Sequence, residues 1–294
     1  MTSPATLTAV TRRYGEVTAL DAVDLTVGEG ELVGLLGPNG AGKSTLLSLL
    51  QGLRRPQAGT VLLFGKDPRD AAARTRLGCT PQDTALPDTL RVGEVIDFVG
   101  GHFAERMPTA ELAAEFGLGE LLRRQTGALS GGQRRRLSVA LAFVGRPRLV
   151  LLDEPTTGLD VDGRRALWDA IRRQHAAGAT VIVTSHYLEE IEALAERVVV
   201  IADGRIVADD TLAAVLARVG SRWVRLATPD PDRVDALPGV VAASRDESGV
   251  ALAVHDSDAF VRELVASGIP FSGLQVRGAT LEEAFLALTE RSAA

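Results

Sequence analysis

The sequence has one cysteine, few lysines and no long apolar run. Cys79 stands alone, which excludes an internal disulfide and a multi-cysteine metal site and favours a reducing compartment. No apolar run approaches the roughly 18 residues of a membrane span, and the first residues lack a basic segment followed by an apolar one. We therefore expect a cytosolic or peripheral protein.

An excess of positive charge is also missing. The 294 residues carry a formal net charge of −6, with a pI near 5.4. A general nucleic-acid-binding protein needs a basic face to neutralise phosphates, so we expect no nucleic-acid partner. Arg134, Arg135 and Arg136 form a local basic cluster that remains a candidate contact. The length favours one large domain followed by a smaller one.

Lysine is scarce: the chain contains only Lys43 and Lys66, and Lys43 occurs within a recognisable motif. Lys43 lies in G-P-N-G-A-G-K-S-T, from Gly37 to Thr45, and this stretch satisfies the phosphate-loop pattern G-x-x-x-x-G-K-[ST]. An apolar strand is predicted before the loop and a helix after it. Backbone N–H groups and the helix N-terminus would then surround a phosphate, Lys43 would reach the β- and γ-phosphates, and Ser44 would bind Mg²⁺.

Two further strands are predicted to end in polar residues. The run Leu149–Leu152 leads into Asp153 and Glu154, and Thr180–Val183 leads into Ser185 and His186. In open, mostly parallel α/β sheets the carboxyl ends of the strands form the ligand-binding edge. Before them, Ser130 is placed to cap a helix that runs to Val144.

The order of these motifs resembles the ATP-binding subunit of ABC transporters. The resemblance rests on the phosphate loop, L-S-G-G-Q at Leu129–Gln133, L-V-L-L-D-E-P-T-T-G-L-D at Leu149–Asp160 and T-S-H at Thr184–His186. It implies an α/β P-loop NTPase of ABC type over residues 1–219, with a mostly parallel sheet, an antiparallel β subdomain and a helical insertion at about 83–145.

The resemblance also implies roles for individual residues. Glu154 would be the general base, His186 would sense the γ-phosphate, and Lys43 and Gln82 would complete the catalytic group. Mg²⁺ would be held by Ser44, Gln82 and Asp153. Tyr14 would stack on adenine, or else pack locally in its turn. The remaining contacts to ATP would come from the phosphate loop and, across a homodimer interface, from the partner chain: Gly37, Pro38, Asn39, Gly40, Ala41, Gly42, Thr45, Ser130, Gly131, Gly132, Gln133 and Asp160.

The implied function is ATP hydrolysis that powers separate membrane-spanning permease subunits, with the chain peripheral on the cytoplasmic face of the membrane. Thr184–Asp210 and the stretch G-A-T-L-E-E-A-F-L at Gly278–Leu286 look most like subunits of multidrug and antibiotic-resistance exporters. The cargo would be drugs, antibiotics or lipid-like compounds. Alternatives are an importer subunit, a soluble ABC ATPase that acts on ribosomes or DNA, and an inactive regulatory subunit.

Residues 220–294 lie outside the ATPase resemblance. Their apolar periodicity predicts a β-α-β-β-α-β order, as in a small α+β ferredoxin-like domain. A final helix follows, with Thr280 and Glu283 spaced as a capping box and Leu281, Phe285 and Leu288 on one face. We expect a binding or regulatory role for this domain, the alternative being a passive extension.

Overall fold

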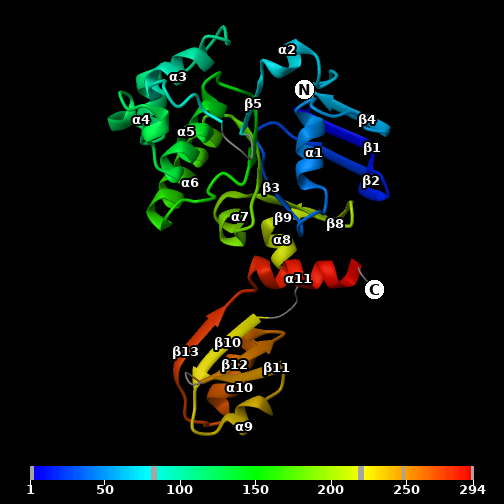
Figure 1. The fold of residues 1–294 in the computed structure, drawn as a ribbon. Coiled ribbons are helices and arrows are strands. Elements are labelled where there is room, and N and C mark those ends of the chain that lie inside the picture. The colour runs from blue at the N-terminus through cyan, green and yellow to red at the C-terminus, as the bar shows by residue number, and fades with distance from the viewer. Residues whose placement is uncertain (1–2, 81–84, 218–221, 247–248, 293–294) are drawn as a thin grey trace. The chain divides into compact units, whose positions relative to one another are not determined.

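The computed structural model describes residues 3–80, 85–217, 222–246 and 249–292 (Figure 1). It divides into two compact units, Met1–Thr211 and Leu212–Ala294. The sequence placed this boundary at 219/220. The division falls earlier because helix α8 (Leu212–Ala217) contacts helix α11 (Leu281–Ser292) and so groups with the second unit.

The first unit contains a six-stranded sheet in the order β5 (Leu77–Thr80), β6 (Leu149–Asp153), β7 (Thr180–Thr184), β3 (Leu32–Leu36), β8 (Arg197–Ala202), β9 (Arg205–Thr211). Neighbouring strands pair in parallel except β8 and β9, which form an antiparallel hairpin. Strands β3 and β7 are buried along their whole length, as expected for central parallel strands covered on both faces. The predicted mostly parallel core is confirmed.

A three-stranded antiparallel sheet, β2 (Val17–Val27), β1 (Ala5–Tyr14) and β4 (Ala58–Leu63), forms the second layer of this unit. Helix α1 (Lys43–Leu50) packs between the two sheets. Its Leu46 and Leu50 share one apolar core with Leu20 of the antiparallel sheet and Leu151 of the parallel sheet. The leucines of α1 are buried while Ser44 is exposed, and this packing fixes the helix that follows the phosphate loop.

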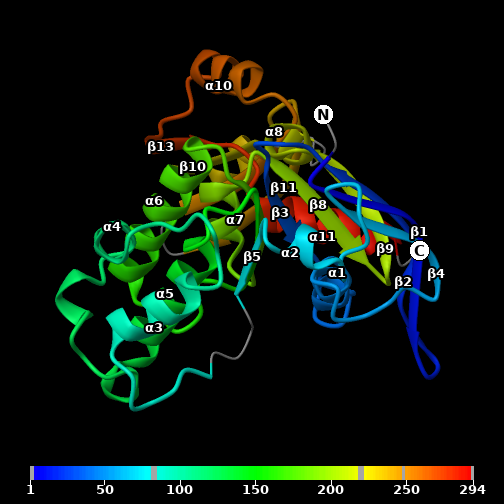
Figure 2. The same cartoon turned by 90° about the horizontal axis from the view of Figure 1, so that it is seen from above.

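Helices α3 (Val92–Gly100), α4 (Thr109–Glu115) and α5 (Gly131–Phe143), with two short 3₁₀ turns at Gly119–Leu121 and Thr126–Ala128, form the insertion. Figure 2 shows these helices on one side of the sheet and β1, β2, β4 and α1 on the other. Val95, Ile96 and Leu112 are buried, and Phe116 packs on Phe143 with ring centroids 5.3 Å apart. Helices α2 (Ala71–Arg74), α6 (Val161–Ala176) and α7 (Leu188–Leu194) complete the unit.

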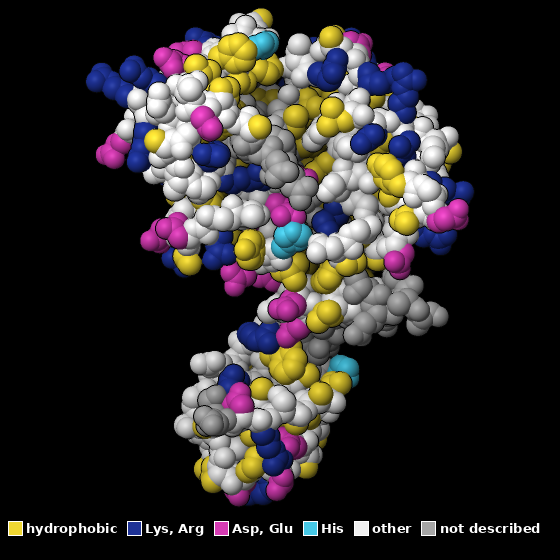
Figure 3. All heavy atoms as spheres, viewed as in Figure 1, with side chains coloured by type: hydrophobic (Ala, Val, Ile, Leu, Met, Phe, Trp, Pro, Cys, Tyr) yellow, Lys and Arg dark blue, Asp and Glu magenta, His cyan; other side chains and the backbone are white. Residues whose placement is uncertain are grey.

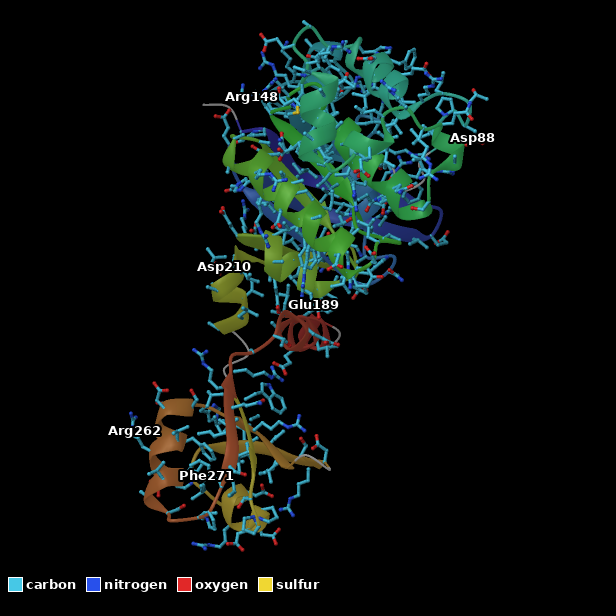
Figure 4. All side chains as sticks on the ribbon, turned by 90° about the vertical axis from the view of Figure 1, so that its left-hand side faces the viewer. Asp88, Arg148, Glu189, Asp210, Arg262 and Phe271 are labelled. Carbon is cyan, nitrogen blue, oxygen red and sulfur yellow. The ribbon has the colours of Figure 1, made fainter. Side chains whose placement is uncertain are left out.

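The second unit has its own antiparallel sheet in the order β11 (Val240–Asp246), β12 (Gly249–Val254), β10 (Arg222–Ala227), β13 (Ser272–Arg277). Helices α9 (Pro231–Asp235) and α10 (Ser257–Ala266) supply Val234, Phe260 and Leu264 to its core. In Figure 4, Arg262 marks α10 and Phe271 the approach to β13. The order β10-α9-β11-β12-α10-β13 is consistent with the predicted ferredoxin-like arrangement. Among the residues described in either unit, no helix is long and apolar enough to cross a membrane.

Candidate functional site

The phosphate loop lies between the carboxyl end of β3 and the first turn of α1. Gly42 caps α1 with φ of 111°, and a Cβ there would come within 2.2 Å of the Ala19 carbonyl oxygen. A Cβ at Gly37 would similarly come within 2.3 Å of the Ile201 carbonyl oxygen. Only glycine fits such positions, so the loop can bring its backbone N–H groups close to an anion.

Lys43 begins α1 and is almost buried, with 8% of its surface exposed. Its ammonium donates to the carbonyl oxygens of Gly37 at 2.6 Å and Pro38 at 3.0 Å, within its own loop. Burial lowers the pKa of Lys43, and the carboxylates of Glu154 and Asp153 partly offset this change. The charge is therefore poorly solvated and close to the acidic pair, as expected for a group that receives a phosphate anion.

Asp153 ends β6, and Glu154 follows it in a left-handed backbone conformation with φ of 50°. The Asp153 carboxylate accepts a hydrogen bond from the Thr184 hydroxyl at 2.5 Å. The Glu154 N–H donates to the Thr184 hydroxyl and to its carbonyl oxygen, each at 3.1 Å. The end of β7 thus fixes both acids, and the Glu154 carboxylate contacts His186 Nε2.

Glu154 and His186 line a cavity of about 360 Å³ together with the phosphate loop. The lining residues are Asn39, Gly40, Gly42, Lys43, Ser44, Thr45, Glu154 and His186. Tyr14, 41% exposed, joins the loop through a hydrogen bond between its hydroxyl and Thr45. Burial raises the pKa of the Tyr14 hydroxyl. Hydrogen bonds with Arg12 and Thr45 and the charge of Arg12 together lower this pKa by a larger amount, so the net shift is downward.

The other predicted nucleotide contacts line a second cavity of about 840 Å³ in the first unit. It contains Ser130, Gly131, Gly132, Gln133 and Asp160. Ser130 caps α5 as predicted: its hydroxyl accepts from the Gln133 N–H at 3.2 Å, and the Gln133 side chain accepts from the Ser130 N–H at 3.1 Å. Within one chain, the lining of this cavity shares no residue with that of the phosphate-loop cavity. Gln82 lies outside the described residues.

The oxygen donors near the loop suit Mg²⁺. The Ser44 hydroxyl opens into the cavity and the Asp153 carboxylate is close to Lys43, which is the combination of few protein oxygens that Mg²⁺ uses together with phosphate and water. No group of three or more His, Cys, Asp or Glu side chains able to hold a metal occurs among the described residues. A site made by the protein alone is thus not present in that part of the chain.

Arg135 has a role that its sequence pattern did not indicate. It belongs to the basic cluster that remained a candidate contact, but in the structure it is only 8% exposed. Its guanidinium donates to the carbonyl oxygens of Pro155 at 3.3 Å and Glu154 at 2.9 Å, and also to that of Asp153. Helix α5 thereby holds the backbone of the acidic pair. A signal was available in the helical position of Arg135, which shares a face with Val139 four residues later, a residue that the structure buries.

Comparison with known proteins gives matches over both units. The profile of the family described as ABC transporter matches residues 20–157. The Daunorubicin resistance ATP-binding protein DrrA3 of Streptomyces coeruleorubidus is 36% identical over 97% of this chain and 95% of its own length. Nod factor export ATP-binding protein I of Burkholderia lata is 35% identical over 98% of both chains.

Two solved structures have the same fold as most of the chain. The ATP-binding subunit of an ABC transporter covers 74% of this chain and 94% of its own, with a TM-score of 0.68 and 27% identity. An ATP-binding cassette solved as a dimer after hydrolysis, bound to ADP and phosphate, covers 71% of this chain and 98% of its own, with a TM-score of 0.64 and 26% identity.

Proposed function

The chain belongs to the ABC transporter family of ATP-binding proteins, and from this premise we propose that it hydrolyses ATP to drive a separately encoded drug or antibiotic exporter. The observation that carries the proposal is the extent of the similarity. Relatives named for drug resistance and for Nod factor export align over nearly the whole chain, including residues 212–294, which lie beyond the family profile.

The phosphate loop binds the triphosphate in this proposal. Lys43 gives up the carbonyl oxygens of Gly37 and Pro38 and turns its ammonium to the β- and γ-phosphates, while the N–H groups at the start of α1 face the same charge. Ser44, Asp153 and Gln82 would hold Mg²⁺, which would neutralise charge on the phosphates. Tyr14, already bonded to Thr45, offers its exposed ring to adenine.

Glu154 acts as the general base. Its carboxylate takes a proton from a water molecule whose oxygen attacks the γ-phosphorus, and ADP leaves. His186 contacts the same carboxylate and is half exposed, at 48% of its side chain, so it can turn to hydrogen-bond the γ-phosphate. The hydrogen bonds of Thr184 and Arg135 keep the Glu154 backbone in place during this exchange.

A second copy of the chain completes the site. Ser130, Gly131 and Asp160 lie around a separate cavity, which supports a head-to-tail pair in which each phosphate loop faces the partner's L-S-G-G-Q segment. The dimeric cassette bound to ADP and phosphate supports the same arrangement. ATP closes the pair and hydrolysis releases it, so the γ-phosphate controls a two-state assembly.

The permease binds the helical insertion in this proposal, and the chain is then peripheral at the cytoplasmic face of the membrane. Phe98 on α3 is 67% exposed, although it packs edge-on against His102 with ring centroids 5.2 Å apart. Figure 3 shows apolar side chains gathered at the upper edge of the first unit, over α3. An exposed aromatic of this size is costly in water and suits a partner helix.

The test is drug accumulation in cells that express the chain with the permease encoded beside it. We expect lower intracellular daunorubicin than in cells with the permease alone, and no reduction with Glu154→Gln in place of the parent chain. Equal reduction by Glu154→Gln would contradict an ATP-driven export. Higher accumulation with the parent chain would point to the importer alternative.

A further inference from the structure

Glu190 on α7 is a fully buried acid that the proposed reaction does not use. Its exposed fraction is 0%, whereas the adjacent Glu189 is exposed at the surface of the first unit (Figure 4). Burying a carboxyl group is unfavourable unless it gains hydrogen bonds in return. The partners of Glu190 therefore show what the structure gains from it.

Two side chains from two segments donate to Glu190. The Thr156 hydroxyl donates to Oε2 at 3.0 Å, and the Trp168 indole N–H of α6 donates to Oε1 at 3.0 Å. The charge of Arg135 on α5 faces the same carboxyl group.

The contact between Thr156 and Glu190 lies beside the residues proposed to react. Thr156 is two residues after Glu154, and Glu190 is four residues after His186, with its backbone N–H donating to the Tyr187 carbonyl oxygen at 3.0 Å. Glu154 and His186 are themselves in contact across the cavity. The Glu190 carboxyl group thus joins the loop that carries the base to the helix that follows the histidine.

We propose that Glu190 is a positioning residue for hydrolysis: by accepting from Thr156, it holds the loop of Glu154 against α7 and so sets the distance between Glu154 and His186. This inference rests on the proposed roles of those two residues. A catalytic base must lie within hydrogen-bond reach of its water, and small displacements cost large factors in rate. ATP binding depends mainly on the phosphate loop, which Glu190 does not contact among the described interactions.

The experiment compares Glu190→Gln with Glu189→Gln in the full chain. Both variants make the same chemical change on the same helix, but only Glu190 is buried. A glutamine at 190 keeps the volume but has only one acceptor oxygen. It cannot accept from the Thr156 hydroxyl and the Trp168 N–H through separate oxygens, as the carboxyl group does, so the contact with Thr156 is weakened. We expect Glu190→Gln to lower the kcat for ATP hydrolysis by about tenfold or more, with the Kd for ATP changed less than about twofold.

Two substitutions at Thr156 separate positioning from loss of fold. Thr156→Val removes only the hydroxyl and should lower kcat several-fold, while Thr156→Ser keeps the hydroxyl and should recover most of that loss. Equal kcat for Glu190→Gln and Glu189→Gln, or a loss confined to ATP affinity, would overturn the inference. So would equal kcat for Thr156→Val and Thr156→Ser. The proposed function is judged separately, by whether the parent hydrolyses ATP and Glu154→Gln does not.

Discussion

At the scale of single residues, Glu154 has an unusual backbone conformation and a carboxylate that lines the cavity. A left-handed conformation is rare for a residue with a Cβ, and here Thr184 and Arg135 hold it by hydrogen bonds to the backbone N–H and carbonyl group. Those bonds do not involve the carboxylate, which contacts His186 and accepts from the Thr157 hydroxyl at 3.4 Å. Glutamine can therefore replace Glu154 without loss of the backbone hydrogen bonds that hold the loop.

The first prediction concerns this side chain. Glu154→Gln keeps the shape and the backbone bonds but cannot accept the proton, so we expect kcat to fall by roughly 10²–10⁴-fold while ATP still binds. The variant should accumulate as an ATP-bound dimer, visible by size-exclusion chromatography with and without ATP. A Glu154→Gln chain that hydrolyses ATP near the parental rate would show that the base lies elsewhere.

The second prediction concerns the pH dependence of stability at Glu190. Burial raises the pKa of this carboxyl group, and hydrogen bonds from Ser185, Trp168 and Thr156 together with the charge of Arg135 only partly offset the effect. The folded state thus holds the proton more tightly than the unfolded state, whose pKa is about 4.3. The resulting contribution to stability is complete below that value and is lost as pH rises through the folded pKa.

Glu190→Gln cannot titrate at this position. Going from about pH 4.5 to pH 8, the free energy of unfolding of the parent should therefore decline relative to that of the variant. Urea unfolding of both proteins across this range measures the difference. A difference that stays constant with pH would mean that the pKa of Glu190 is the same in the folded and unfolded states.

At the scale of elements, the sequence located the parts of the site that depend on local pattern. The spaced glycines of the phosphate loop, the apolar run of β6 and the Ser130–Gln133 capping box each specify their own geometry, and the structure has the corresponding loop, strand and helix start. The contacts of Arg135, Thr184 and Glu190 were not predicted, because they join segments far apart in the sequence. Arg135 and Glu154 are brought together only when α5 packs against β6.

The third prediction tests this contact between α5 and β6. Arg135→Leu leaves the carbonyl groups of Asp153, Glu154 and Pro155 without the guanidinium, so we expect a loss of about 1–3 kcal/mol of stability and a lower kcat. Arg135→Lys should fall in between, since an ammonium lacks the planar fork. The control is Arg165→Leu at an exposed position of α6, expected within about 0.5 kcal/mol of the parent in thermal unfolding. Equal stability of the two leucine variants would contradict the role of Arg135.

At the scale of the whole molecule, alternation and helical periodicity predicted the β-α-β-β-α-β order of residues 220–294 and the helix that follows it. The described elements have this order, from β10 (Arg222–Ala227) to β13 (Ser272–Arg277), and α11 (Leu281–Ser292) comes after them. The expected boundary at 219/220 differs from the division between Thr211 and Leu212, because the grouping of α8 with α11 depends on contacts between residues about seventy positions apart. Periodicity reports which face of a helix is apolar and not which partner covers it.

The last prediction follows from the separation of the two cavities. In a symmetric pair, each site takes its phosphate loop from one chain and its L-S-G-G-Q segment from the other. Mixing Lys43→Ala with Ser130→Arg gives heterodimers in which both lesions fall in one site and the other site is intact. Random exchange makes half of the dimers mixed, so the mixture should regain about a quarter of the parental ATPase rate if the sites act independently. Lys43→Ala mixed with Ser44→Ala damages both phosphate loops and should regain nothing. Recovery of activity in the first mixture alone would establish that each ATP is held by two chains. If both mixtures stay inactive although mass spectrometry detects heterodimers, the two sites are either not shared between chains or must act together.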